Sequence, residues 1–160
     1  MPLLKKRTNK EITEIYLRNI DSVYRTAFAF LKNKANTEDA VQTTFIKLIN
    51  SSPKFKNKDH EKAWLIFTCS NTCKDMLRRK YNTEEPLIDE AASTENVDSL
   101  LDEVLALPVK LRTAIYLHYY EGYTSEEIGK IQNLSSSTVR NQLHDEREIL
   151  KKRLGGNFFE

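Results

Sequence analysis

Apolar residues recur at spacings of three and four along most of the chain, a pattern typical of amphipathic helices. The longest stripe runs from Ile12 to Leu31 and predicts one long helix. A further stripe predicts another helix from Glu61 to about Tyr81, whose basic end suits the negative pole of a helix dipole. Strands have no comparable signal, so the pattern favours an all-α fold.

A shorter helix is expected between these two. Residues 32–35 form a polar break, and Asn36 with Asp39 three residues later has the form of an N-cap and its acidic partner. Apolar positions from Ala40 to Ile49 then carry the helix. Pro53 is expected to end it, because proline lacks an amide donor and restricts the residue before it.

The second half of the chain predicts a helix-turn-helix. A short helix at 101–107 is expected to lead, through Pro108 as a first helical residue, into a helix that Gly122 closes. Thr124 and Glu127 then match a capping box at the start of a two-turn helix. Residues 133–135 form a turn, and a final helix runs from Ser136 to Leu154.

Composition agrees with a helical fold and divides the chain by charge. Gly and Pro together make up 8 of the 160 residues, which leaves few helix breakers. Residues 1–82 hold 17 Lys/Arg and 8 Asp/Glu, a net charge of +9. Residues 83–103 hold 8 Asp/Glu and no Lys/Arg, and residues 104–160 have a net charge of +1. A basic first block favours a polyanionic partner such as nucleic acid, although a well-solvated lysine-rich surface has the same composition.

The predicted organisation is therefore two small helical domains joined by a flexible acidic linker. We expect the first domain at 1–82, the linker at 83–99, the second domain at 100–154 and a tail at 155–160. Like charges are expected to keep the linker extended. No apolar run exceeds five residues, and the first ten residues lack a signal-peptide core, so the cytoplasm is the expected compartment.

The final helix carries side chains suited to a DNA major groove. A helix fits that groove, where Arg can bond guanine, Asn can bond adenine, and Ser or Thr can bond phosphate. Val139 and Leu143 are expected to face inward against Ile128 and Ile131. An ordinary helical hairpin with a polar outer face is the alternative.

Two separated stretches of the chain carry a set of motifs. The first comprises Thr37–Phe45, Trp64-Leu65, Asn71, Asp75, Arg78 and Arg79. The second comprises Leu107-Pro108, Arg112, Glu121–Thr124, Glu127-Ile128 and Ser137–Arg140. In their order, their spacing and the linker between them, the two stretches resemble bacterial RNA polymerase sigma factors of the extracytoplasmic-function group, over roughly residues 12–154.

The resemblance implies a transcription initiation factor that binds core RNA polymerase, recognises promoters and helps melt the minus-ten element. It implies polymerase contacts, on the clamp helices of the largest subunit, from Asp39, Gln42, Thr43, Phe45 and Lys47. It implies minus-ten contacts from Lys54, Phe55, Lys56, Asn57, Lys58, Trp64, Asn71, Lys74, Arg78 and Arg79, with 54–60 as a basic loop. It implies minus-thirty-five contacts from Thr124, Ser136, Ser137, Thr138, Arg140, Asn141, His144 and Asp145.

The same resemblance implies that the second domain sits on the polymerase flap and that the linker threads the polymerase channels. An anti-sigma factor is a further partner that this family commonly has. The residues alone agree with strand opening, which needs cationic groups beside aromatic ones. Trp64 packed in the core, and Phe55 anchoring its loop, are the alternatives to base contact.

Several positions depart from the family pattern. Thr43 stands where Glu is usual and Ala40 where Leu is usual, which predicts altered polymerase docking. In the second domain the departures are Gly129 for Ala, Ser137 for Gly, and Gln142, Asp145 and Glu146 for Arg, Arg and Ala. We expect Asp145 to matter most, because a carboxylate is repelled by phosphates yet can accept from cytosine.

Enzyme and metal sites have little support in the sequence. Cys69, Cys73 and His60 supply three potential ligands where structural zinc normally takes four. No glycine-rich phosphate loop or catalytic triad pattern occurs, so we expect no cofactor, no metal and no catalysis by the chain itself.

Two other classes of function remain open at this stage. One is a stand-alone helix-turn-helix regulator that binds DNA without polymerase, although the chain has no heptads for dimerisation. The other is a sigma-like partner protein that binds only other proteins. DNA binding by the protein without polymerase separates a stand-alone regulator from a sigma factor. A sigma factor alone should bind little DNA, because its near-neutral second domain predicts few phosphate contacts.

Overall fold

The computed structural model describes residues 6–83 and 103–154, and in these ranges every regular element is helical. This confirms the all-α prediction. The chain forms two compact units, one within residues 1–88 and one within 89–160. The predicted linker, apart from its first residue, and the predicted tail lie outside the described residues. No described helix is long and apolar enough to cross a membrane.

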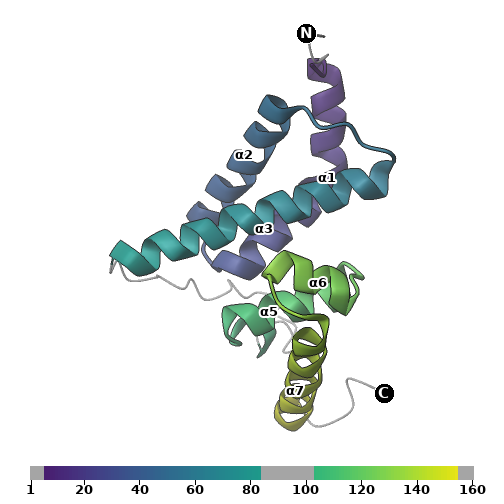
Figure 1. Ribbon diagram of the computed structural model, residues 1–160. Helices are drawn as coiled ribbons and strands as arrows, with labels where there is room; N and C mark the ends of the chain where they lie inside the picture. The colour runs from purple at the N-terminus through teal and green to yellow at the C-terminus, as the bar shows by residue number, and fades with distance from the viewer. Residues whose placement is uncertain (1–5, 84–102, 155–160) are drawn as a thin grey trace. The chain divides into compact units, whose positions relative to one another are not determined.

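The first unit is a bundle of three helices, α1 (Asn9–Leu31), α2 (Lys34–Ser51) and α3 (Lys58–Thr83). Each packs against the other two, and Figure 1 shows α3 crossing both of its partners. The core that they share is built from the apolar stripes, with small residues where helices approach closely. Its fully buried members include Val23, Ala27, Ala40, Leu48, Leu65, Ile66, Cys69 and Cys73.

The junction between α1 and α2 is tighter than the sequence predicted. Lys32 adopts a left-handed conformation with φ of 51°, and Asn33 follows as the N-cap of α2. The Asn33 side chain accepts a hydrogen bond from the amide of Asn36 at 2.9 Å. The prediction that Asn36 is the N-cap was therefore wrong by about one helical turn. Asn33, three residues earlier, is the N-cap and binds the amide of Asn36.

The end of α2 is where the sequence placed it. The helix stops at Ser51, and Ser52 is left-handed with φ of 44° immediately before Pro53. The next helix starts earlier than expected, since α3 begins at Lys58. Asn57 Oδ1 accepts from the amide of His60 at 2.8 Å and so satisfies a donor of the first turn. The loop is thus residues 52–57, and the expected loop residues 58–60 are helical.

The second unit holds α5 (Val109–Ile115), the π-helical turn η1 (Tyr116–Tyr120), α6 (Ser125–Gln132) and α7 (Ser136–Leu154), with residues 103–105 also helical. Pro108 is the N-cap of α5, not its first helical residue, since its ψ of 153° is extended. The last turn of the expected helix widens into η1, whose carbonyls accept from Glu121 and Tyr123. Gly122, with φ of +78°, then reverses the chain.

Candidate nucleic-acid interface

Local interactions define the start of α6, the turn that follows it and the start of α7. Both halves of the predicted capping box are present, with Glu127 N donating to Thr124 Oγ1 at 3.2 Å and Thr124 N to Glu127 Oε1 at 3.1 Å. At the other end, Asn133 is left-handed with φ of 59°. The Ser135 hydroxyl then accepts from the amide of Thr138 at 3.2 Å and starts α7.

Gly129 makes the turn between the two helices possible. Its carbonyl accepts from Leu134 N at 2.8 Å, and a Cβ built on Gly129 would lie 2.5 Å from the Leu134 carbonyl oxygen. That separation is a steric clash with backbone. The departure from the usual alanine therefore fits the close approach of this turn.

The outer face of α7 carries the residues expected to read DNA. Val139 and Leu143 are buried, as are Ile128 and Ile131 of α6, so the two helices pack through the predicted faces. On the remaining face, Ser136 is half-buried and the other predicted DNA-reading side chains of α7 are exposed. The exposed side chains are Ser137, Thr138, Arg140, Asn141, His144 and Asp145.

One charged residue of α7 lies inside the unit. Glu146 is fully buried, and neither of its carboxylate oxygens has a hydrogen-bond partner. Burial, together with the charge of Asp145, raises the pKa of Glu146 to about 8. The sequence marked Glu146 only as a departure from the family pattern, and a charged residue type gave no signal that it would be buried.

In the first unit, the exposed side of α2 holds most of the residues expected to contact polymerase. Asp39, Gln42 and Lys47 are exposed and Thr43 is half-buried. Lys47 Nζ also donates to Thr72 Oγ1 of α3 at 2.9 Å. Phe45 differs from the rest because it is buried, with its ring centroid 4.9 Å from that of Tyr16. Its place in the structure is to hold α2 on α1.

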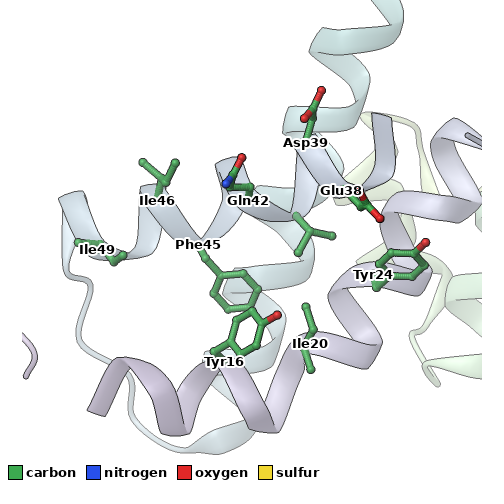
Figure 2. A pocket seen from close by; sticks show the side chains of 10 residues that line it. Tyr16, Ile20, Tyr24, Glu38, Asp39, Gln42, Phe45, Ile46 and Ile49 are labelled. Atoms are coloured by element: carbon green, nitrogen blue, oxygen red, sulfur yellow. The ribbon is translucent and has the colours of Figure 1, made fainter. Parts of the chain in front are cut away.

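Two grooves flank α2. The first, of about 690 Å³, lies between α1 and α2 and is mainly apolar, with Glu38 and Asp39 at one end. Figure 2 shows Tyr16 and Phe45 facing each other inside it, while Gln42 and Ile46 point away from α1. Ile46 and Ile49 are exposed although the apolar stripe counted Ile49 toward the core. Helical periodicity alone did not predict that these two side chains would be exposed.

The second groove, of about 400 Å³, lies between α2 and α3 and is polar. It brings the predicted polymerase residues other than Phe45 beside Arg79 of the predicted minus-ten set. Its lining is Asp39, Gln42, Thr43, Lys47, Thr72, Asp75, Met76 and Arg79.

The loop of residues 52–57 and the adjoining part of α3 contain the other expected DNA contacts. Lys54, Lys56, Asn57 and Lys58 are exposed. Phe55 is half-buried, with its ring centroid 5.9 Å from that of Trp64, which is also half-buried. The two aromatic residues therefore pack on each other, which agrees with an anchoring role for Phe55.

Farther along α3, the cationic residues differ in their surroundings. Arg79 is exposed, and Arg78 is exposed and paired with Asp75. Asn71 and Lys74 are half-buried, and burial lowers the pKa of Lys74. The exposed cationic end of α3 is thus confined to its last turns.

The two cysteines lie inside the bundle. Cys69 and Cys73 are one turn apart on α3, and the Cys69 thiol lies 3.6 Å from the Val23 carbonyl oxygen. A hydrogen bond with Cys69, together with burial, raises the pKa of Cys73 well above its ordinary value. Both side chains are free cysteines packed in the core.

Comparison with known proteins matches both units. Residues 15–83 match the model of sigma-70 region 2, and residues 98–150 match that of sigma-70 region 4. The extracytoplasmic-function RNA polymerase sigma factor SigW of Bacillus subtilis is 29% identical, over 90% of this chain and 87% of the relative. The chain belongs to the extracytoplasmic-function group of RNA polymerase sigma factors. The sigma factor CarQ of Myxococcus xanthus is 26% identical to this sigma factor, over 89% of this chain and 88% of CarQ.

Solved structures have the same fold as this sigma factor. RpoE of Bartonella quintana, solved with the anti-sigma factor NepR, has a TM-score of 0.74 at 19% identity and covers 92% of this chain and 99% of its own. CnrH, solved with the cytosolic domain of CnrY, has a TM-score of 0.65 at 22% identity, over 94% of this chain and 91% of its own.

Proposed function

We propose that this sigma factor binds core RNA polymerase, directs it to specific promoters and opens their minus-ten element. One observation carries the proposal: region 2 and region 4 of the sigma-70 family match in order on two separate helical units. A stand-alone regulator would need only the helix-turn-helix. The first unit therefore favours the initiation factor over that alternative.

The exposed side of α2 is the proposed polymerase-docking face. Gln42 and Ile46 are one turn apart and point away from α1, so a helix of the polymerase could pack across both. Asp39 and Thr43 lie beside them in the polar groove. In this proposal the partner surface is the clamp of the largest polymerase subunit.

The 52–57 loop, with α3 behind it, is the proposed minus-ten site. Strand opening requires displaced bases to be held while cationic groups contact the backbone. The exposed ammonium groups of Lys54 and Lys56 supply the cations, and Arg79 adds another on α3. The proposal thus assigns the melted DNA to the block of residues 1–82, whose net charge is +9.

The outer face of α7 is the proposed minus-thirty-five site. Arg140 and Asn141 are exposed near its start, where a recognition helix enters the major groove. Thr124, exposed at the start of α6, is proposed to contact the DNA backbone. Asp145 on the same face is expected to shift base preference away from that of typical family members.

RpoE of Bartonella quintana, which has this fold, was solved with an anti-sigma factor, and we extend that class of partner to this chain. Nucleotide addition is assigned to the polymerase, so the chain itself is proposed to be a non-enzyme. Its place of action is where polymerase and DNA meet, in the cytoplasm.

Run-off transcription tests the function directly. The purified chain would be mixed with core polymerase and fragments of its own genome, including the region upstream of its own gene. Discrete transcripts that require both proteins are the expected result. Retention of DNA by the chain alone, with no response from the core, would replace the proposal with a stand-alone regulator.

A further inference from the structure

Arg7, in the short segment ahead of α1, reaches across to the 52–57 loop. Its guanidinium carbon lies 4.9 Å from the centroid of the Phe55 ring, and its Nη2 donates a hydrogen bond to the carbonyl of Pro53. The hydrogen bond joins residues that are 46 positions apart in the chain. Together the contacts combine a cation–π contact with a charge-assisted hydrogen bond, and both hold the loop backbone.

The start of α3 holds the loop from its other side. The Phe55 ring lies 5.9 Å from the ring of Trp64 and 5.5 Å from that of His60, between centroids. The amide of Lys56 donates to His60 Nδ1 at 3.0 Å. Phe55 is thus enclosed between Arg7 and the first turns of α3, so the loop is anchored through its own aromatic residue.

The anchored loop leaves its polar side chains facing solvent. Lys54 and Lys56, on either side of the enclosed Phe55, are exposed. Because Phe55 is fixed, the two lysines are held on a backbone of defined shape. A loop that is ordered before it binds avoids the entropic cost of ordering at the moment of strand capture.

We propose that Arg7 is a positioning residue for promoter opening, which fixes the 52–57 loop so that its lysines meet the melted minus-ten strand. The inference rests on the proposed function and adds to it a residue outside both regions matched to the family. Arg7 acts through the loop and is not itself assigned a DNA contact.

Limited proteolysis of the full chain tests, without DNA, whether Arg7 holds the 52–57 loop in place. Trypsin cuts after Lys54 and Lys56, and a protease needs a locally unfolded segment. We expect Arg7→Ala to speed cleavage at these two sites by about tenfold, given the usual strength of such contacts. Cleavage after Lys47, inside α2, reports global unfolding and should not change. An unchanged rate at Lys54 and Lys56 would overturn the proposal.

Two further variants serve as controls for this test. Lys10→Ala removes the same charge from an exposed position in the first turn of α1 and should leave cleavage at wild-type rates. Arg7→Lys keeps a cation that can lie over Phe55 but loses the planar fork of donors. It should restore protection to within about threefold of wild type.

Transcription on the DNA fragment upstream of the chain's own gene tests the positioning role. Arg7→Ala should lower the rate of open-complex formation on duplex DNA about tenfold while binding core polymerase normally, and Arg7→Lys should recover most of it. Faster proteolysis combined with wild-type opening would overturn the positioning role. If the wild-type chain itself yields no transcripts from any genomic fragment, the proposed function fails and the promoter-opening role of Arg7 falls with it, whatever proteolysis reports.

Discussion

The guanidinium of Arg18 in α1 donates two hydrogen bonds to the carboxylate of Glu61 in α3, at 3.1 Å from Nε and 2.8 Å from Nη2. Asn19 adds a third donor to the same carboxylate at 2.9 Å. Glu61 is buried while Arg18 is partly exposed. The interaction therefore joins two helices through one satisfied, buried charge.

Removing this carboxylate should destabilise the first unit. We expect Glu61→Ala to lower its free energy of unfolding by about 2–3 kcal/mol, because Arg18 and Asn19 lose their acceptor. Asp21→Asn is the matched control, since Asp21 pairs with Arg25 at 4.0 Å on the surface and should cost under about 0.5 kcal/mol. A urea titration followed on the amide resonances of α1 and α3 measures both. Equal losses in the two variants would contradict the assignment.

The same carboxylate predicts acid sensitivity of the first unit. Burial raises the pKa of Glu61, but the hydrogen bonds from Arg18 and Asn19, together with the charges of Arg18 and Arg7, outweigh it, so the pKa is lowered from 4.5. A lowered pKa means that the stabilisation is present above pH 4.5 and is lost as the pH falls below it. Thermal unfolding between pH 6 and 3 should show a fall in melting temperature that is smaller in Glu61→Gln.

The buried Glu146 predicts the opposite pH dependence for the second unit. Its pKa is raised to about 8, so the folded unit holds a proton that the unfolded chain releases. Stability should therefore decline as the pH rises from about 4.5 to 8, at up to about 1.4 kcal/mol per pH unit. Glu146→Leu should stabilise the unit and flatten its profile, whereas Glu148→Gln, an exposed change on the same helix, should do neither. Amide resonances of α7 through urea titrations at several pH values provide the measurement.

The turn of the helix-turn-helix predicts a steric requirement at Gly129. Alanine there would meet the Leu134 carbonyl at 2.5 Å, so we expect Gly129→Ala to destabilise the second unit by about 1–2 kcal/mol, despite the better helix propensity of alanine. Gly122→Ala is an informative comparison, because φ of +78° strains the backbone there while its Cβ would meet nothing within 4 Å. A change of the Leu134 side chain should not rescue Gly129→Ala, since the clash involves the Leu134 backbone carbonyl. If Gly129→Ala were as stable as the wild type, the backbone of the turn would have to shift to accommodate the added methyl group.

The docking face predicts which surface changes weaken polymerase binding. Ile46→Asp should reduce affinity for core polymerase at least about tenfold, because half of the Ile46 side chain is exposed beside Gln42 on the proposed face. Leu17→Asp is the control, since Leu17 is more exposed but lies on α1 and lines neither groove. Both should fold like the wild type. Equal affinity for all three chains, measured by displacement from immobilised core, would move the docking face elsewhere.

The recognition helix predicts altered promoter choice when Asp145 is changed. Asp145→Arg should raise affinity for promoter DNA by roughly tenfold and change the set of genomic fragments transcribed, because it replaces a repelled carboxylate with a guanine-reading group. Glu148→Arg adds the same charge on α7 and should raise affinity without changing the set. If Asp145→Arg alters neither affinity nor choice, the side chain does not face DNA.

The sequence sufficed for features that depend on local periodicity. The stripes of apolar residues identified the helices, and Thr124 with Glu127 identified the capping box, because each depends on residues within one or two turns. Local signals were ambiguous where two similar residues competed, as Asn33 and Asn36 did for the cap of α2. Either could cap a helix, and only the packed bundle selects one.

Contacts between distant residues were beyond the sequence. Arg7 with Phe55, and Arg18 with Glu61, pair charged or aromatic groups more than 40 residues apart, and no periodicity links them. The burial of Glu146 could not be predicted either, because glutamate is almost always found at the surface. The candidate site depends on such features for its shape, whereas its residue types were visible in the sequence.

Trp64 is the only tryptophan in the chain, and it packs against the loop proposed to capture the promoter. Indole emission from the free protein therefore originates at one place, beside Phe55. A stopped-flow instrument could follow rearrangement of this loop in real time without any attached dye. Polymerase tryptophans would add a constant background, which a Trp64→Phe chain would measure. Trp64 is thus an intrinsic fluorescence probe that could report when the loop responds to DNA.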